Sequence, residues 1–282
     1  MRRDQPLPTG ARSLILAGAL LIGAATMAVA TEPCGDFGEC KALIEINSSD
    51  GDIGFHFLTD GDDLVVGRLR GPDGLLFHEE AMGPLAEQFF TELFVESAEP
   101  LCWEDPGEPG EDVVTLEEFL DRFSAGLYVA LGKDEDGELA EGVTELTYKL
   151  PAAPQDVDFD GSVISWDSGD DLGNCATSAE LTELVMAGIL PVHPEDVEID
   201  MWEIVLEPDV EDGDPTGQMV YSIRVPGDIA VKEVEVPAGY LASLPDDTPV
   251  KIEIGGIGGK DNATFTEEDG FCVNEVEGCE EE

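Results

Sequence analysis

Short runs of alternating apolar and polar residues recur after residue 40, and turn-forming residues separate them. Residues 43–46, 53–58 and 64–69 are the first three runs, and Asp-Gly steps at 50–51 and 60–61 lie between them. Alternation places every second side chain on one face of a strand, and Asp-Gly between two such runs favours a hairpin turn. The pattern predicts a mainly β fold.

Two segments have helical patterns instead. Thr115 and Glu118 resemble a capping box that opens a short helix. A second helix is expected over 178–190, with an apolar stripe formed by Ala179, Leu181, Leu184, Val185 and Ile189. Residues 84–97 fit a short helix or a strand equally well.

The first thirty residues have the pattern of a secretory signal. Arg2, Arg3 and Arg12 precede an apolar run at 14–30, which ends in Ala-Val-Ala. A basic start, an apolar middle and small residues at the exit are typical of a cleaved signal peptide. We expect export of the chain and a signal peptide over 1–30; an uncleaved anchor is the alternative.

The segment Leu-Pro-Ala-Ala-Pro at 150–154 divides the remaining chain. Before it we expect a β-rich, sandwich-like domain with one short helix (31–150). After it we expect a second β-sandwich domain (151–275) and an acidic tail (276–282). The first half resembles secreted bacterial proteins of unknown function, which implies no particular chemistry.

The second half contains segments in a characteristic order. They are Pro151 with Pro154, Val163-Ile164-Ser165-Trp166, 202–206, 219–225, 231–236, a leucine-bearing turn at 241–245, 249–255 and 264–273. This order resembles the fibronectin type III family, which implies a seven-stranded sandwich that spaces, docks or recognises. Ile252 and Ile254 stand where the family carries a tyrosine in its sixth strand. The connection at 167–200 is too long for the fold and is expected to be a helical insertion, either functional or a cover for a sheet edge.

The charge balance restricts the partners of this chain. It has 13 Lys and Arg against 64 Asp and Glu, a net charge of −51. Phosphate binding depends on Lys and Arg, so nucleic acid and anionic membranes are not expected partners. A hydrophobic fraction of 42% argues against disorder. Cations, basic partners or a saline habitat fit this surface.

All the cysteines lie beyond the expected signal peptide: Cys34, Cys40, Cys102, Cys175, Cys272 and Cys279. An even count in an exported chain predicts disulfides. Three cysteines fall on each side of 150–154, so either one bridge joins the halves or two cysteines stay unpaired. The first two and the last two are close enough in sequence to close small loops, and the connectivity stays open.

A possible calcium site begins after the dividing segment. Asp156, Asp158 and Asp160 with Gly161 open an Asp-x-Asp-x-Asp-Gly motif, and Asp167 stands at its twelfth position. The flanking sequence predicts strands, which excludes a helix-loop-helix site. A looser oxygen cage for calcium is the remaining hypothesis; chance spacing in an acidic chain is the alternative.

Three other motifs bear on candidate chemistry. The glycine-rich run at 255–260 fails the phosphate-loop pattern and is expected to be a flexible hairpin loop. Alternation places His56 on the strand face opposite Phe55 and Phe57. There, His56 and His78 either hold a metal ion or are plain surface residues. Asn262 begins an Asn-Ala-Thr glycosylation motif.

The sequence contains no Gly-x-Ser-x-Gly, no His-Glu-x-x-His and no Cys/His nucleophile arrangement. Because the fibronectin type III resemblance implies a fold that spaces, docks or recognises, we expect a non-enzymatic binding or structural protein that is secreted, periplasmic or in the cell envelope. Its partner is expected to be a protein or a carbohydrate, bound at the 167–200 insertion or the 255–260 loop. A carbohydrate-active hydrolase with a cleft between the halves is one alternative. A calcium-rigidified spacer or adhesin is another.

Overall fold

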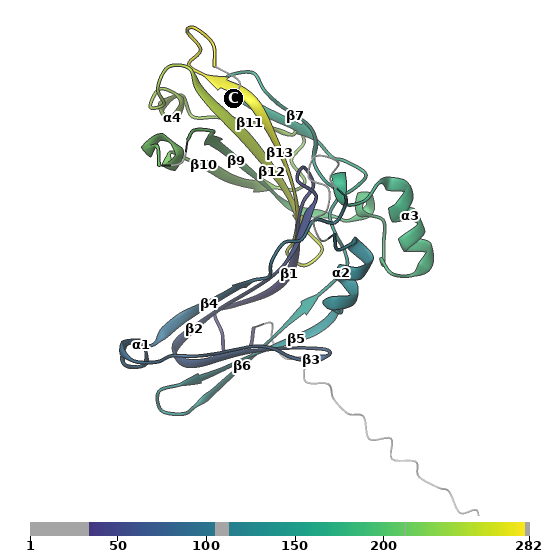
Figure 1. Ribbon diagram of the computed structural model, residues 1–282, viewed down its shortest axis with the longest axis vertical. Coiled ribbons are helices and arrows are strands. Elements are labelled where there is room, and N and C mark those ends of the chain that lie inside the picture. Colours follow the sequence, from purple (N-terminus) through teal and green to yellow (C-terminus); the bar gives the residue numbers. More distant parts are fainter. Residues whose placement is uncertain (1–33, 105–112, 212, 280–282) are drawn as a thin grey trace, which may run out of the picture. The chain divides into compact units, whose positions relative to one another are not determined.

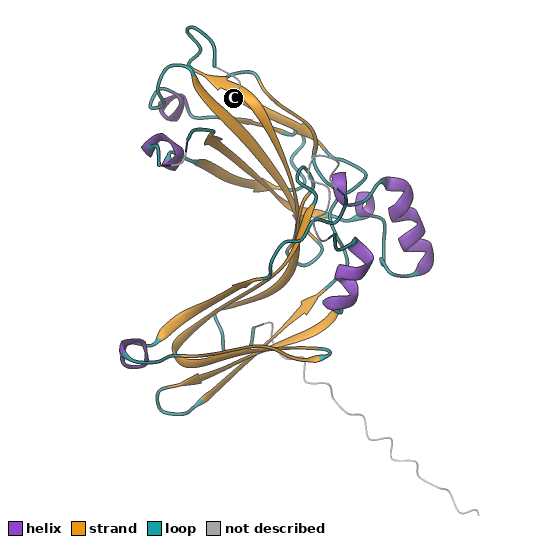
Figure 2. Cartoon of the chain, in the orientation of Figure 1, coloured by secondary structure: helices purple, strands orange, loops and turns teal. Residues whose placement is uncertain are grey.

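The computed structural model describes residues 34–104, 113–211 and 213–279 (Figure 1). The expected signal peptide (1–30), the segment 105–112 and the end of the acidic tail (280–282) lie outside these ranges. Strands predominate in the described chain, which confirms the mainly β prediction (Figure 2). Within these ranges, no helix has the length and apolarity needed to cross a bilayer.

The first half forms six strands and two helices: β1 (Glu39–Asn47), β2 (Asp52–Gly71), β3 (Gly74–Glu80), α1 (Pro84–Gln88), β4 (Phe90–Glu96), α2 (Leu116–Arg122), β5 (Gly126–Asp134) and β6 (Leu139–Leu146). The segment 84–97 therefore contains both a helix and a strand. At the start of α2, the Thr115 side chain accepts a hydrogen bond from the Glu118 backbone N–H, which confirms the Thr115 half of the predicted capping box.

The long strand β2 changes partners halfway along its length. It pairs with β1 up to Asp60 and with β4 as far as Leu64, and beyond this point β5 and β3 are both its partners. The hairpin turn predicted at 60–61 is wrong, because the strand continues through this step. The register shifts between Asp60 and Leu64, and Asp63 has a φ of +50°, so a local irregularity absorbs the change of partner.

The second half contains the remaining elements: β7 (Gln155–Phe159), β8 (Val163–Asp167), η1 (Gly173–Cys175), α3 (Ser178–Ala187), η2 (Pro194–Asp196), β9 (Ile199–Pro208), η3 (Pro215–Gln218), β10 (Tyr221–Pro226), β11 (Glu233–Glu235), α4 (Ala238–Leu241), β12 (Thr248–Gly258) and β13 (Asn262–Val273). One sheet has the order β11-β8-β7, and the other contains β10-β9-β12-β13. Both contribute to one hydrophobic cluster, in which Trp166 of β8 meets Trp202 of β9 edge to face.

A single sheet connects the two halves of the chain. Its strand order is β10-β9-β12-β13-β1-β2-β5-β6. The connection is the parallel pair of β13 and β1, in which Ala263 lies opposite Glu45 and Phe265 lies opposite Asn47. The last strand of the chain therefore pairs with the first strand of the described region.

The dividing segment is buried against β13 rather than exposed between the halves. Pro151, Ala152, Ala153 and Pro154 are all buried. Alternate side chains of β13 donate hydrogen bonds to successive carbonyls of residues 147–154: Asn262 Nδ2 to Thr147 (2.9 Å) and Lys149 (3.0 Å), Thr264 Oγ1 to Pro151 (2.7 Å) and Thr266 Oγ1 to Pro154 (2.7 Å). We call these three side chains the β13 polar row.

Asn262 also fastens β1. Its Oδ1 accepts a hydrogen bond from the backbone N–H of Ile44 at 2.9 Å, while its Nδ2 binds the carbonyls described above. The side chain is fully buried and both ends of its amide are used. The Asn-Ala-Thr motif is therefore not a glycan acceptor in the folded protein, because the acceptor nitrogen is inaccessible.

The cysteines form three disulfides within the described chain. Cys34–Cys40 and Cys272–Cys279 close the short loops that the sequence allowed. Cys102–Cys175 is the bridge between the halves, with a Cα–Cα distance of 5.0 Å. It fastens the start of the 167–200 insertion to the first half of the chain.

The expected helix of the insertion is present as α3, and it ends earlier than predicted. Thr177 and Glu180 form a capping box at its start, and Gly188 in the left-handed conformation ends it. Leu181 and Leu190 are buried in the hydrophobic cluster of the first half, whereas Ala179 is exposed, so its place in the predicted stripe is wrong. The predicted boundary at 150/151 stays a prediction.

Removing one hydroxyl of the β13 polar row tests its energetic role. Thr264→Val preserves the side-chain shape but leaves the buried Pro151 carbonyl without its donor. We expect the free energy of unfolding to fall by about 1–3 kcal/mol, the usual cost of an unpaired buried polar group.

Chemical denaturation measures this change. Thr144→Val in β6 is the control, since the described chain offers its hydroxyl no hydrogen-bond partner. An equal loss of stability in both variants would contradict the role of the polar row.

Candidate binding site

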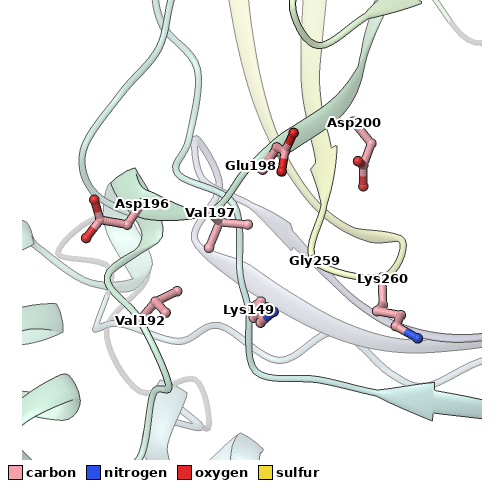
Figure 3. A pocket seen from close by; sticks show the side chains of 8 residues that line it. All are labelled: Lys149, Val192, Asp196, Val197, Glu198, Asp200, Gly259 and Lys260. Atoms are coloured by element: carbon pink, nitrogen blue, oxygen red, sulfur yellow. The ribbon is translucent and has the colours of Figure 1, made fainter.

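A hollow of about 460 Å³ lies where two segments singled out from the sequence meet. The 167–200 insertion and the turn after β12 both line it. Its lining comprises Lys149, Val192, Asp196, Val197, Glu198, Asp200, Gly259 and Lys260 (Figure 3). The 167–200 insertion and the 255–260 segment were predicted as alternative binding surfaces. In the structure, both segments line the same hollow.

Close backbone contacts position the turn that forms one wall of the hollow. A Cβ atom on Gly258 would overlap the carbonyl oxygen of Glu198, and one on Gly259 would overlap that of Lys149. Gly259 also has a φ of +58°, which favours glycine. The glycines therefore allow tight packing here. The predicted hairpin between the last two strands is present, but its turn covers only residues 259–261, because residues 255–258 belong to β12.

The opposite wall comes from the end of the insertion. The 3-10 turn η2 supplies Asp196, and the chain then continues through Val197 and Glu198 into β9. A proline at the start of η2 and hydrogen bonds from Asp196 N and Val197 N to His193 O and Pro194 O hold this short turn. The wall is therefore built from backbone that is locally ordered.

The hollow combines both signs of charge. Lys149 and Lys260 lie on one side of it, and the carboxylates of Glu198 and Asp200 lie across from them (Figure 3). The chain has only 13 Lys and Arg, so two exposed lysines at one hollow are a local exception in a strongly acidic protein. Such a surface offers charged donors and acceptors to a polar ligand, beside apolar area of similar size.

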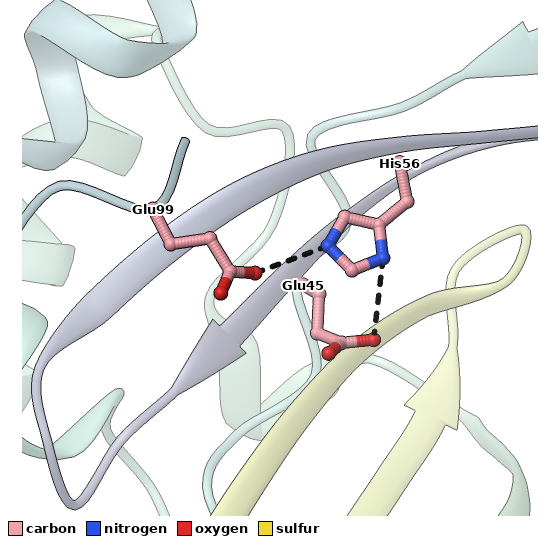
Figure 4. Close-up of side chains that lie close together, drawn as sticks. All are labelled: Glu45, His56 and Glu99. Carbon is pink, nitrogen blue, oxygen red and sulfur yellow. Dashed lines mark hydrogen bonds and ion pairs between the residues drawn. The ribbon is translucent and has the colours of Figure 1, made fainter. Parts of the chain in front are cut away.

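A second cluster, which sequence reasoning did not assemble, lies on the first half. Glu45 of β1, His56 of β2 and Glu99 after β4 bring three ligand atoms within 4.8 Å of one another (Figure 4). His56 Nε2 lies 3.1 Å from Glu99 Oε1, and Nδ1 lies 3.8 Å from Glu45 Oε2. In the described residues no other group of three His, Cys, Asp or Glu converges in this way.

The position of His56 agrees only in part with the predictions made for this residue. Its ring lies opposite the buried face that holds Phe55 and Phe57, as strand alternation predicted, but the residue is only 8% exposed. The proposed pairing with His78 is wrong, because His78 lies opposite Arg68 of β2 rather than beside His56. Only long-range pairing brings Glu45 and Glu99 to His56, so no local signal in the sequence could have identified the cluster.

The four aspartates of the calcium hypothesis lie in and around the β7–β8 hairpin. Asp156 and Asp158 are in β7, and Asp167 pairs with Gln155 at the end of β8. Asp160 Oδ1 accepts hydrogen bonds from the backbone N–H groups of Ser162 and Val163 in the hairpin turn. No three of these four carboxylates converge, so a calcium site on them stays a prediction without geometric support.

A row of acidic residues crosses the sheet that connects the two halves, on strands β9, β12 and β13. Glu253 lies opposite Glu267, and Lys251 lies between Glu207 and Glu267, with Nζ–O distances of 3.0 and 2.8 Å. Burial raises the pKa of Glu253 from 4.5 to about 7, and repulsion by Glu267, Glu45 and Glu207 adds to this effect. Glu253 is therefore protonated in the folded protein over a range where it ionises when unfolded.

Comparisons with known proteins do not assign a family. No protein-family model and no curated protein matches the chain. Solved structures that match include a tetra-tandem repeat from the extending region of a large adhesion protein (TM-score 0.26, 12% identity), the BSP domain of a biofilm-associated protein (0.21, 12%) and a structure on host cell surface retention of a 1.5-MDa bacterial ice-binding adhesin (0.21, 13%).

The alignments cover 83%, 86% and 86% of this chain and 50%, 30% and 65% of those structures, in the same order. This chain thus spans less than two thirds of each. At TM-scores this low, the likeness supports neither a shared fold nor a shared function.

Substituting Glu253 tests the charge energetics of the sheet. A carboxyl whose pKa is raised on folding loses stability as pH increases through the window from 4.5 to about 7. We expect Glu253→Gln to increase the free energy of unfolding at pH 8 by about 1 kcal/mol, after allowance for partial solvent screening, and to leave it unchanged at pH 4.

Thermal or chemical unfolding at the two pH values gives the measurement. Glu268→Gln, at an exposed position of β13, removes the same charge and is the matched control. If both variants gained equally at pH 8, total charge rather than the environment of Glu253 would be the cause.

Proposed function

We propose that this protein is an exported, non-enzymatic binding or structural module of the cell envelope or extracellular space. The hollow between the 167–200 insertion and the β12–β13 turn is its binding surface. This hollow carries the proposal, because a long insertion and a tight glycine turn meet there and add two lysines to an acidic chain. The partner is a polar ligand, either a protein or a carbohydrate.

The second half is proposed to be a fibronectin type III-like domain with the insertion at 167–200. Support comes from the strand order, in which three strands (β11-β8-β7) face four strands (β10-β9-β12-β13). Six of the seven strands overlap the segments expected from the resemblance, and β7 begins directly after the expected entry at Pro151 and Pro154. Ile252 and Ile254 occupy fully buried core positions on β12, where the family carries its tyrosine-bearing strand.

Export is supported by the three disulfides and by the signal pattern at 1–30. Disulfides persist in oxidising compartments and are rare in the cytosol. Purification of the protein from the producing cells followed by N-terminal sequencing tests this part, and we expect the mature chain to begin at Thr31. A retained leader, or free thiols in the native protein, would contradict it.

The binding surface is tested by reversing the charge of its lysines. The mature protein is screened against arrays of polysaccharides and of surface proteins, and Lys149→Glu/Lys260→Glu is compared with the wild type. Because charge-assisted contacts contribute roughly 1.5–3 kcal/mol each, we expect the variant to bind its ligand at least about tenfold more weakly.

Lys133→Glu/Lys232→Glu makes the same change in net charge away from the hollow and is the matched control. Equal weakening by both variants would show that overall charge, not the hollow, controls binding. Turnover of any array ligand would replace the binding module with an enzyme.

A further inference from the structure

We propose that Glu45, His56 and Glu99 form a binding site for one divalent transition-metal ion of the zinc type. The site lies on the first half of the chain and is independent of the proposed function of the hollow. Three elements supply its ligands: β1, β2 and the segment that follows β4. The proposal is based on the chemistry of these side chains, on their spacing and on a glycine that makes room for them.

The distance between the His56 and Glu99 ligand atoms is close to the distance between two ligands of a bound zinc ion. Two ligands about 2.0–2.2 Å from a tetrahedral zinc ion lie about 3.3–3.5 Å apart. His56 Nε2 and Glu99 Oε1 are 3.1 Å apart. A carboxylate oxygen of Glu45 is within 4.8 Å of a ring nitrogen of His56 and of a carboxylate oxygen of Glu99. Glu45 Oε2 lies 3.8 Å from Nδ1, the other ring nitrogen, so the Glu45 side chain has to rotate toward Nε2 to complete the set (Figure 4).

Gly54 provides the space for the cluster. It lies directly opposite Glu45 in the β1–β2 ladder. A Cβ atom at this position would come 2.5 Å from Glu99 Oε1 and 2.9 Å from His56 Nε2. A glycine in the middle of a strand weakens the strand and often marks a close approach, which here is the approach of two ligand atoms.

The surroundings fix the histidine. The residue is 8% exposed, and the Phe94 ring packs edge-on against its imidazole with centroids 5.9 Å apart. A side chain held in this way loses little rotamer freedom when it binds an ion. The two glutamate side chains are 34% and 33% exposed, which leaves the ion a path from solvent.

The ligand set selects the class of metal. Calcium and magnesium take oxygen ligands, whereas an imidazole nitrogen suits zinc, nickel, iron or copper. A neutral imidazole with two carboxylates carries a charge of −2, which a divalent ion neutralises. Three protein ligands leave a fourth tetrahedral position for water or for a group from a partner.

Zinc titration of the mature, oxidised protein in high sodium chloride tests the site. The salt screens diffuse attraction to surface carboxylates. We expect saturable binding of one zinc ion per chain that excess calcium or magnesium does not displace, together with a zinc-dependent rise in Tm. Weak, non-saturable uptake, or equal competition by calcium, would overturn the proposal.

Four variants locate the ion. His56→Gln and Glu99→Gln each remove a ligand, and Gly54→Ala retains all three ligands but pushes Glu99 away. Loss of even an outer-shell partner commonly weakens metal binding about 10–100-fold, so we expect at least tenfold weaker binding in all three. His78→Gln changes an exposed histidine and should bind zinc like the wild type.

Gly54→Ala keeps the test decisive if His56→Gln fails to fold. Circular dichroism and the melt without zinc establish which variants are folded. Full zinc affinity in folded Gly54→Ala and Glu99→Gln, or its loss in His78→Gln, would place the ion elsewhere and refute the site.

Discussion

Hydrogen bonds from one face of β13 to a buried, proline-rich segment are the constraint on which the rest of this structure depends. Pro151 and Pro154 have no N–H to donate, yet the carbonyls of this segment still need donors once they are buried. Asn262, Thr264 and Thr266 supply them. Because Asn262 also binds the Ile44 N–H, the same row aligns β13 with β1 and makes one sheet from the two halves.

The candidate binding surface depends on this arrangement. Asn262 holds the Lys149 carbonyl and follows directly on the Gly259–Asp261 turn, so it fixes two parts of the hollow. The opposite wall belongs to an insertion that Cys102–Cys175 fastens to the first half. Disulfide, polar row and glycine turn thus position side chains that are far apart in the sequence.

Local patterns predicted the cap at Thr115 and the helix at 178, and the resemblance to the fibronectin type III family predicted the strands of the second half. Those features depend on alternation, on short-range hydrogen bonds and on turn chemistry. The partner change within β2 and the burial of 150–154 depend on which strands pair over long distances. A local pattern does not contain that information, so Asp60-Gly61 resembled a hairpin turn and Pro-Ala-Ala-Pro resembled a spacer.

The candidate sites were predictable only as far as their residues depend on local patterns. Strand alternation indicated the face of His56, but its burial and its two glutamate neighbours follow from the pairing of β2 with β1 and β4. Conversely, Asp156, Asp158 and Asp160 match a calcium motif by spacing, yet two lie along a strand and Asp160 caps a turn. In a chain with 64 acidic residues, spacing alone is a poor guide to convergence.

Native-state hydrogen exchange of the Ile44 amide tests the central claim most directly, because this N–H donates to Asn262 at the point where the halves join. If the polar row makes β1 and β13 one cooperative unit, Ile44 exchanges only on global unfolding, with the same free energy as the core amide of Ile252. Exchange of Ile44 at a much lower free energy, while Ile252 stays protected, would show that β1 separates locally from β13 and would contradict this account.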